Sequence, residues 1–193
     1  FEQVRIDNDV QMFIEADSKQ AKLQLHREDS SVAADDVVGQ ITFTGRDSGG
    51  AGTQRVGAAI SAIASSAWDT GQSIGYAPTH LDFFTQNNTG SETTLTPRLR
   101  ISSGGRILIN NSTAENTMGL NAKVQTFGTD ASSSSVAIRR GSNDAQAAFL
   151  VLSKSRNASV GSRTILQNGD EVGNIFFVAD DGTTQEIINN RIT

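Results

Sequence analysis

The sequence contains no cysteine and only two histidines, His26 and His80, among its 193 residues. A disulfide framework and a thiolate metal site both require cysteine, so both are excluded. Two histidines are also too few for a metal site built from imidazoles alone. We therefore expect no metal and no other cofactor.

Long apolar runs and an excess of positive charge are lacking as well. No stretch approaches the roughly 20 apolar residues that cross a bilayer, and the first residues lack the apolar core of a secretory signal. The formal net charge of −5 argues against nucleic-acid binding, which depends on clustered Lys and Arg. The sequence therefore predicts neither membrane insertion nor a nucleic-acid partner.

Short runs of alternating polar and apolar residues, bounded by Gly, Asn, Asp and Ser, make up most of the chain. This pattern is typical of an all-β protein. The Ala-rich stretch 55–64 fits a helical turn or a strand, and Gly57 together with the Gly-rich loop before it favours the strand. The other strands expected in the first half cover residues 22–26, 38–43, 80–85, 96–101 and 106–110, and a tight turn at 102–105 joins the last two as a hairpin.

The alternation is lost over residues 111–122, which are rich in polar turn formers. We therefore expect a first β-rich repeat unit at 21–110, a linker at 111–122 and a second unit at 123–193. Residues 1–20 would be the end of a preceding module or a linker. Because the chain opens at Phe1 and stops inside a strand pattern, we expect a piece of a longer polypeptide whose second unit is incomplete at its C-terminus.

A local pattern recurs between the two halves. Residues 36–43 (DVVGQITF) match residues 170–177 (DEVGNIFF) at an offset of 134 positions. An alternating strand is expected before each copy, at residues 23–26 and 149–153. Each copy is followed by a loop containing Asp and Gly and then by a Thr-Gln pair. A degenerate repeat of short strands predicts an elongated array in which each unit buries its apolar face against a neighbour.

These strings resemble the repeat found in bacteriophage tail fibres and related tail appendages. The similarity covers roughly residues 20–110 and 125–193. In the first half it rests on AKLQLHR (21–27), DVVGQITF (36–43), LDFFT (81–85) and RLRISSGGRI (98–107). In the second half it rests on GTDA (128–131), LVLSKSR (150–156), QNGD (167–170), GNIFF (173–177) and ADDGT (179–183).

The resemblance implies an intertwined parallel homotrimer with a β-prism or β-helix-like shaft. Its expected place is the virion, with host cytoplasm as the site of assembly, and its expected partners are other phage tail or baseplate proteins. Its role would be structural and not enzymatic: the shaft would position host-receptor-binding parts for adsorption. Two alternatives remain open, a receptor-recognition domain that binds a host surface glycan and a tail-spike polysaccharide depolymerase.

Trimerisation also has a physical rationale in the sequence. A chain with many alanines and few aromatic residues encloses a core of its own poorly, whereas three copies around an axis share one. The Ala-rich stretch 55–64 is expected to lie where the chains contact one another. The predicted trimer interface within it is Val56, Ala59, Ile60 and Ile63.

A predicted glycan contact consists of Trp68, Tyr76 and His80, which lie close together in a loop-rich stretch. Sugar rings stack on aromatic faces, but a single Trp and a single Tyr are more often packing residues whose polar ends reach a partner. Packing is therefore the favoured interpretation.

Two catalytic patterns occur and both favour structural interpretations. Residues 71–75 spell G-x-S-x-G around Ser73, yet Tyr-Ala-Pro follows where a nucleophile elbow needs a helix. The carboxylate pairs at 35–36 and 180–181 offer the two acids that glycoside hydrolysis requires, but both pairs border turns, where Asp is common for its own hydrogen bonds. No catalytic residue is predicted.

Arg98 and Arg100 share one face of an expected strand and could bind an anionic glycan or a phosphate. The favoured interpretation is a solvated strand face whose opposite side, Leu99 and Ile101, is buried.

Overall fold

A computed structural model describes residues 22–46, 54–68, 75–87, 95–180, 182 and 185–192. The chain divides into two compact units, Phe1–Ser103 and Gly104–Thr193, which are treated separately below. All regular secondary structure in the described residues is β, and none of it is helical, so the predicted all-β class is confirmed. Accordingly, no described helix could cross a membrane.

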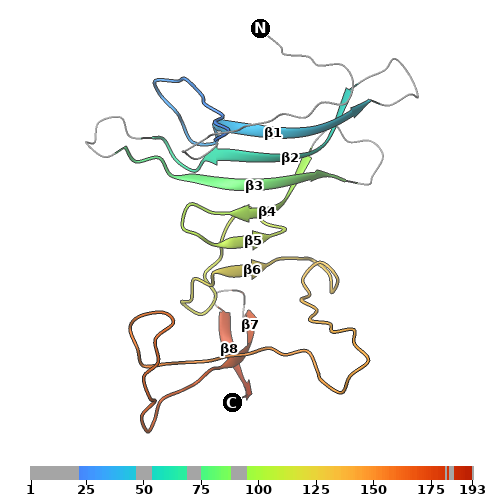
Figure 1. Cartoon of the computed structure of the whole chain (residues 1–193). Coiled ribbons are helices and arrows are strands. Elements are labelled where there is room, and N and C mark those ends of the chain that lie inside the picture. Colours follow the sequence, from blue (N-terminus) through green and yellow to red (C-terminus); the bar gives the residue numbers. More distant parts are fainter. Residues whose placement is uncertain are drawn as a thin grey trace. The chain divides into compact units, whose positions relative to one another are not determined.

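The first unit contains an antiparallel meander in which each strand pairs with the next along the chain (Figure 1). Its segments alternate polar and apolar residues, as strands with two different faces do. The strands are β1 (Val37–Arg46), β2 (Gln54–Ala64), β3 (Thr79–Gln86) and β4 (Leu95–Ile101). The Ala-rich stretch is therefore a strand, as the glycines around it predicted.

Two irregularities in this sheet follow from single residues. Phe43 pairs with Ala58 and Thr44 with Val56, which leaves Gly57 as the extra residue of a bulge between β1 and β2. Pro97 pairs with Phe84 at the shift of register between β3 and β4. Proline has no N–H to give to a ladder, so an irregular position suits it.

The two faces of the meander differ in chemistry and in burial. Cross-strand partners lie on the same face, so the pairs Ser61–Asp82 and Asp82–Arg100 place polar residues of three strands together. Ser61 and Asp82 are each only 1% exposed. The opposite face is apolar and incompletely buried. Its large side chains include Ile60, Leu81, Phe83 and Leu99, which are half buried, and Ile41 and Phe43, which are 43% and 56% exposed.

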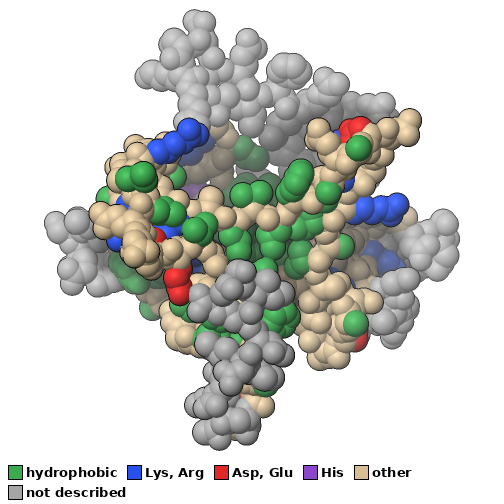
Figure 2. Space-filling view, turned by 90° about the horizontal axis from the view of Figure 1, so that it is seen from below, with side chains coloured by type: hydrophobic (Ala, Val, Ile, Leu, Met, Phe, Trp, Pro, Cys, Tyr) green, Lys and Arg blue, Asp and Glu red, His purple; other side chains and the backbone are tan. Residues whose placement is uncertain are grey.

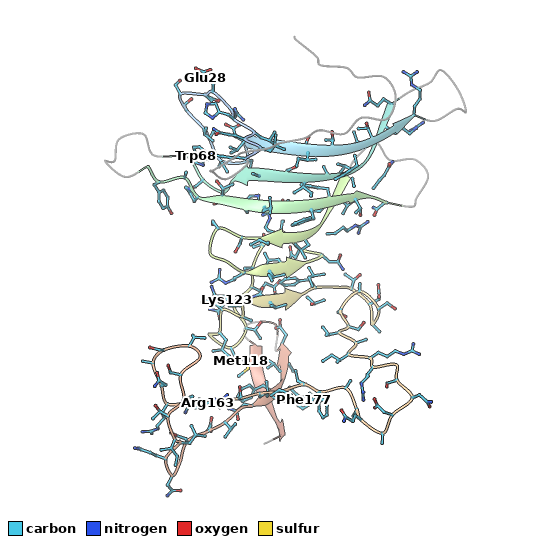
Figure 3. All side chains as sticks on the ribbon, in the orientation of Figure 1. Glu28, Trp68, Met118, Lys123, Arg163 and Phe177 are labelled. Atoms are coloured by element: carbon cyan, nitrogen blue, oxygen red, sulfur yellow. The ribbon has the colours of Figure 1, made fainter. Side chains whose placement is uncertain are left out.

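The second unit contains two strand pairs. Strands β5 (Ile107–Ile109) and β6 (Val124–Thr126) are parallel, and β7 (Ile175–Asp180) pairs antiparallel with β8 (Gln185–Ile192). Just before β6, Lys123 Nζ donates a hydrogen bond to the Gly104 carbonyl at 2.9 Å (Figure 3). Residues 127–174 form no strand and no helix.

Two segments expected as strands, 22–26 and 149–153, lie in no strand. Both have the alternating or apolar sequence of a strand, so the missing element is a hydrogen-bonded neighbour. A strand exists only as part of a ladder, and the described part of the chain supplies none at these positions.

Hydrophobic side chains remain at the surface in both units, and many are visible in green in Figure 2. On β7, Phe177 is 48% exposed (Figure 3). Isolated exposed apolar residues are ordinary in proteins, but a whole half-buried sheet face is not. The described residues therefore include more exposed apolar surface than scattered single side chains account for.

Candidate functional site

The most buried polar feature of the first unit is an ion pair between β3 and β4. Arg100 Nε and Nη2 donate to the two carboxylate oxygens of Asp82 at 2.7 and 2.6 Å. This two-pronged geometry matches the planar guanidinium to the planar carboxylate. The Asp82 side chain is 1% exposed and that of Arg100 is 19% exposed, so the carboxylate depends on this partner for its charge.

His80 lies on the same face, two residues before Asp82 on β3. Its Nε2 atom is 3.7 Å from Asp82 Oδ2, beyond hydrogen-bond distance, and the residue is 5% exposed. Burial is the main cause that lowers the pKa of His80 below its usual 6.5, and the nearby Arg100 charge lowers it further. At neutral pH the imidazole is therefore uncharged.

Ser61 extends the polar cluster onto β2 and β1. Its hydroxyl accepts a hydrogen bond from Gln40 Nε2 at 2.8 Å. Together Ser61, His80 and Asp82 include the residue types of a catalytic triad, but all three are buried, and Arg100 occupies both oxygens of the acid. The arrangement is suited to fixing strand register and not to binding a substrate.

A second feature is the turn that leads into β1. Asp36 N donates to the Ala33 carbonyl at 3.4 Å, and Ala33 N donates to Asp36 Oδ2 at 2.9 Å. Asp35 has a φ of +68°, a left-handed conformation that Asp tolerates better than most residues. The acidic pair 35–36 therefore serves a turn.

The turn at residues 167–170 repeats this geometry in the second unit. Asp170 N donates to the Gln167 carbonyl at 3.1 Å, and Gln167 N donates to Asp170 Oδ2 at 2.9 Å. Gly169 has a φ of +90° at the position equivalent to Asp35. Three turn positions thus correspond at the offset of 134.

A basic side chain from the preceding segment contacts the turn aspartate in both units. Arg27 Nη2 lies 3.1 Å from Asp36 Oδ2, and Arg156 Nε lies 2.6 Å from Asp170 Oδ2. The hydrogen bond from Arg156 is the main cause that lowers the pKa of Asp170 to about 2, and the Gln167 amide contributes next. Both turns are therefore fastened to the segment before them.

The glycine of each Val-Gly pair is a point of close packing. A Cβ added to Gly39 would lie 3.0 Å from Leu25 Cβ, and one added to Gly173 would lie 2.8 Å from Leu152 Cβ. In each unit a leucine of the preceding segment thus lies directly on the backbone just after the turn. Sequence reasoning found these glycines as a repeated motif without finding the leucines that require them.

The predicted trimer-interface residues divide between the two faces of β2. Ala59 and Ile63 lie on the face of Ser61, whereas Ile60 lies on the opposite face, as the alternation along the strand requires. Ala59 is buried within one copy, Ile60 and Ile63 are half buried, and Val56 is 37% exposed. Their role at a contact between chains stays a prediction.

The predicted glycan-contact residues differ in accessibility. Tyr76 is 62% exposed, whereas His80 is buried inside β3. Trp68 is half buried, and its backbone N–H donates to the Val32 carbonyl at 2.9 Å. Only Tyr76 therefore offers a largely open ring, and glycan contact stays a prediction.

The remaining catalytic candidates lie in turns or outside the described residues. Asp180 Oδ1 accepts a hydrogen bond from Gly182 N at 2.8 Å, the pattern of an Asx turn. Asp181 and Ser73 lie outside the described residues.

The interpretation of Arg98 and Arg100 as a solvated stripe is wrong for Arg100. Its partner Asp82 is buried, while Ile101, expected in the core, is 38% exposed. The physical reason is that Asp82 and Arg100 are cross-strand partners and neutralise each other. Two neighbouring predicted strands carry charged residues of opposite sign, which is a signal for an ion pair, but neither strand alone encodes the register that places Arg100 opposite Asp82.

Among the described residues, no three His, Asp or Glu side chains are grouped so that they could hold a metal ion. Comparison of the sequence with protein-family models and with curated proteins gives no match.

Proposed function

We propose that this chain is a non-enzymatic structural segment of a bacteriophage tail fibre or a related virion appendage. It assembles as an intertwined parallel homotrimer into an elongated, repeat-containing shaft that positions receptor-binding parts. The observation that carries the proposal is the module described above, which occurs twice. It consists of a fastened turn (33–36 and 167–170), a leucine on a glycine (Leu25 on Gly39 and Leu152 on Gly173) and an antiparallel hairpin (β1–β2 and β7–β8).

The incomplete burial of a single copy supports self-assembly. The apolar face of the first meander is half buried, and the segments before both turns have strand-like sequences without ladder partners. Copies of the same chain supply matching faces and edges, and rotational symmetry lets them close into a finite assembly. The number three comes from the resemblance of the strings in both halves to the tail-fibre repeat.

A glycan-binding role for this same segment is the second candidate, and the exposed ring of Tyr76 favours it. The described residues offer no comparable observation for the depolymerase alternative, because Asp35, Asp36 and Asp180 all serve turns.

Two measurements test the proposal. Sedimentation velocity or mass photometry at micromolar concentration is expected to give three times the chain mass, and a stable monomer would refute the assembly. Adsorption of the phage to its host in the presence of excess purified chain then separates the two binding roles. A shaft segment leaves adsorption unchanged, whereas a receptor-binding segment competes, and a Tyr76→Ala variant then loses the competition.

A further inference from the structure

The second unit contains an apolar segment at residues 147–152 (AAFLVL) that lies in no strand. Its large side chains are all exposed: Phe149 71%, Leu150 67%, Val151 75% and Leu152 47%. In an extended chain successive side chains point to opposite sides, so four consecutive apolar residues make both sides apolar. An uninterrupted apolar run of this length is typical of a strand that is covered on both faces.

One side of the apolar segment is already in use within the chain. Leu152 lies on Gly173, with its Cβ 2.8 Å from the position that an added Cβ would take, and it is the least exposed of the four. Leu150 shares that side by alternation. Phe149 and Val151 share the other side, where exposure is higher for both.

The charged residues that flank the apolar segment are paired within the chain. Arg140 Nη2 lies 2.5 Å from Asp144 Oδ2 on one side, and Arg156 contacts Asp170 on the other. Charged partners are therefore not required there, and a matching surface is apolar. The backbone of residues 147–152, which lies in no ladder, offers N–H and C=O groups to a neighbouring strand.

The exposed apolar area of the segment is of the size that marks an interaction site. A fully buried aliphatic or aromatic side chain contributes about 1.5–3 kcal/mol at about 25 cal/mol per Å², or roughly 60–120 Å² each. Its four large side chains, all exposed, therefore offer at most roughly 240–480 Å². This is comparable to the largest exposed apolar patch on a typical monomer, roughly 300–600 Å², which is often a functional surface.

We infer that residues 147–152 form a self-association seam: in the assembled protein this segment pairs, strand against strand, with a second copy of the chain, which covers Phe149 and Val151. The inference rests on the self-assembly proposed above and names the surface that performs it. A second copy is the occupant because the segment before the first turn also leaves its leucines open, Leu23 at 54% and Leu25 at 47%. Both copies of the module leave leucines uncovered, and a second copy of the chain, which carries the same modules, is the partner that fits both.

The test uses the full chain and two matched aspartate variants. Val151→Asp places a charge in the seam, whereas Val160→Asp places the same charge at the tip of the turn closed by the Ser162 N to Ser159 O hydrogen bond. Val160 is fully exposed and is the control. Burying an unpaired charge in an interface is expected to weaken assembly at least about tenfold in Val151→Asp, and Val160→Asp is expected to assemble like the wild type.

Hydrogen exchange of the same chain reports on the backbone. Amides of residues 147–152 are expected to be protected in the assembled chain and to lose protection on dilution to the monomer. Since the chain has no cysteine, Val151→Cys gives a single thiol that is expected to form disulfide-linked dimers on oxidation, whereas Val160→Cys is not. This variant keeps the side chain small and neutral, so the test holds even where Val151→Asp does not fold.

Three outcomes would overturn the inference. If the assembled wild type exchanges amides 147–152 without protection and Val151→Cys gives no linked dimers, the seam is wrong while the proposed homotrimer stands. Protection that persists unchanged in the diluted monomer shows that the chain covers the segment itself. A wild type that is monomeric at micromolar concentration removes both the seam and the homotrimer.

Discussion

The Arg100–Asp82 pair provides the sharpest test of the first unit, and the perturbation is Arg100→Met. Methionine keeps the length of the side chain and removes the guanidinium that binds both oxygens of Asp82 at 2.6 and 2.7 Å. Because Asp82 is 1% exposed, water does not replace the lost donors without opening the sheet. The substitution therefore leaves a buried carboxylate without its main partner.

The expected loss follows from this geometry. Breaking a buried ion pair from one side costs about 3–5 kcal/mol, in line with two hydrogen bonds to a charged group at about 1.5–3 kcal/mol each. The matched control is Arg98→Met on the same strand. Arg98 donates only to uncharged oxygens in the described contacts, those of Thr85 and Asn87. Its loss therefore leaves no buried charge unpaired and should cost about 1 kcal/mol.

Urea unfolding at one fixed protein concentration measures both variants, because the stability of an assembled protein depends on concentration. With a urea slope of about 2 kcal/mol per M, Arg100→Met should lower the midpoint by roughly 1.5–2.5 M and Arg98→Met by about 0.5 M. Equal shifts for the two variants would refute the reasoning. Replacing both partners, with Asp82→Leu and Arg100→Met together, should recover most of the loss, since no buried charge then remains.

Three further results are expected. The folded-state pKa of His80 lies below its unfolded value of 6.5, so the unfolded chain takes up the proton first as the pH falls. The contribution of His80 to stability should therefore be full above pH 6.5 and fall as the pH drops below it, as measured by urea midpoints at pH 7.5 and 5.5. His80→Gln should remove this pH dependence, and His26→Gln, at an exposed position, should keep it. The Asp170 carboxylate, with its pKa lowered to about 2, should stay ionised and stabilise its turn down to acid pH, and this stabilisation should be lost only as the pH falls toward 2. A carbon-13 NMR titration of the carboxyl group should show this. Arg156→Met should raise that pKa. Gly173→Ala brings a Cβ to 2.8 Å from Leu152 Cβ and should lower the free energy of unfolding by about 1–3 kcal/mol in thermal or urea unfolding. The control Gly141→Ala, with open space around it, should change stability little. Equal effects would show that the leucine does not require the glycine.

The strands of the first unit could be predicted because their alternation is local information. Residues 38–43 and 80–85 lie within β1 and β3, and Gly57 decided correctly for a strand in β2. Register is not local: nothing in the run around Asp82 says that Arg100 lies opposite it, so the ion pair and the buried face could not be assigned in advance. The same limit explains the segments at 22–26 and 149–153, whose strand-like sequences need partners that one chain does not provide.

The reversed burial of the meander, polar side chains inside and apolar side chains half open, separates two tasks. Slipping β4 by one residue against β3 would place Arg100 on the apolar face and leave Asp82 opposite a leucine or an isoleucine, so the ion pair penalises a one-residue slip by several kcal/mol. A buried ion pair adds little net stability over apolar residues of the same size, however, so stability must come from elsewhere. The half-buried face of Ile41, Phe43, Ile60, Leu81, Phe83 and Leu99 is the available source once it is covered. We therefore expect the doubly apolar variant, Asp82→Leu with Arg100→Met, to recover most of the wild-type stability but to populate more than one register, seen as extra or broadened amide signals for β3 and β4. One sharp set of signals would show that the ion pair does not specify the register.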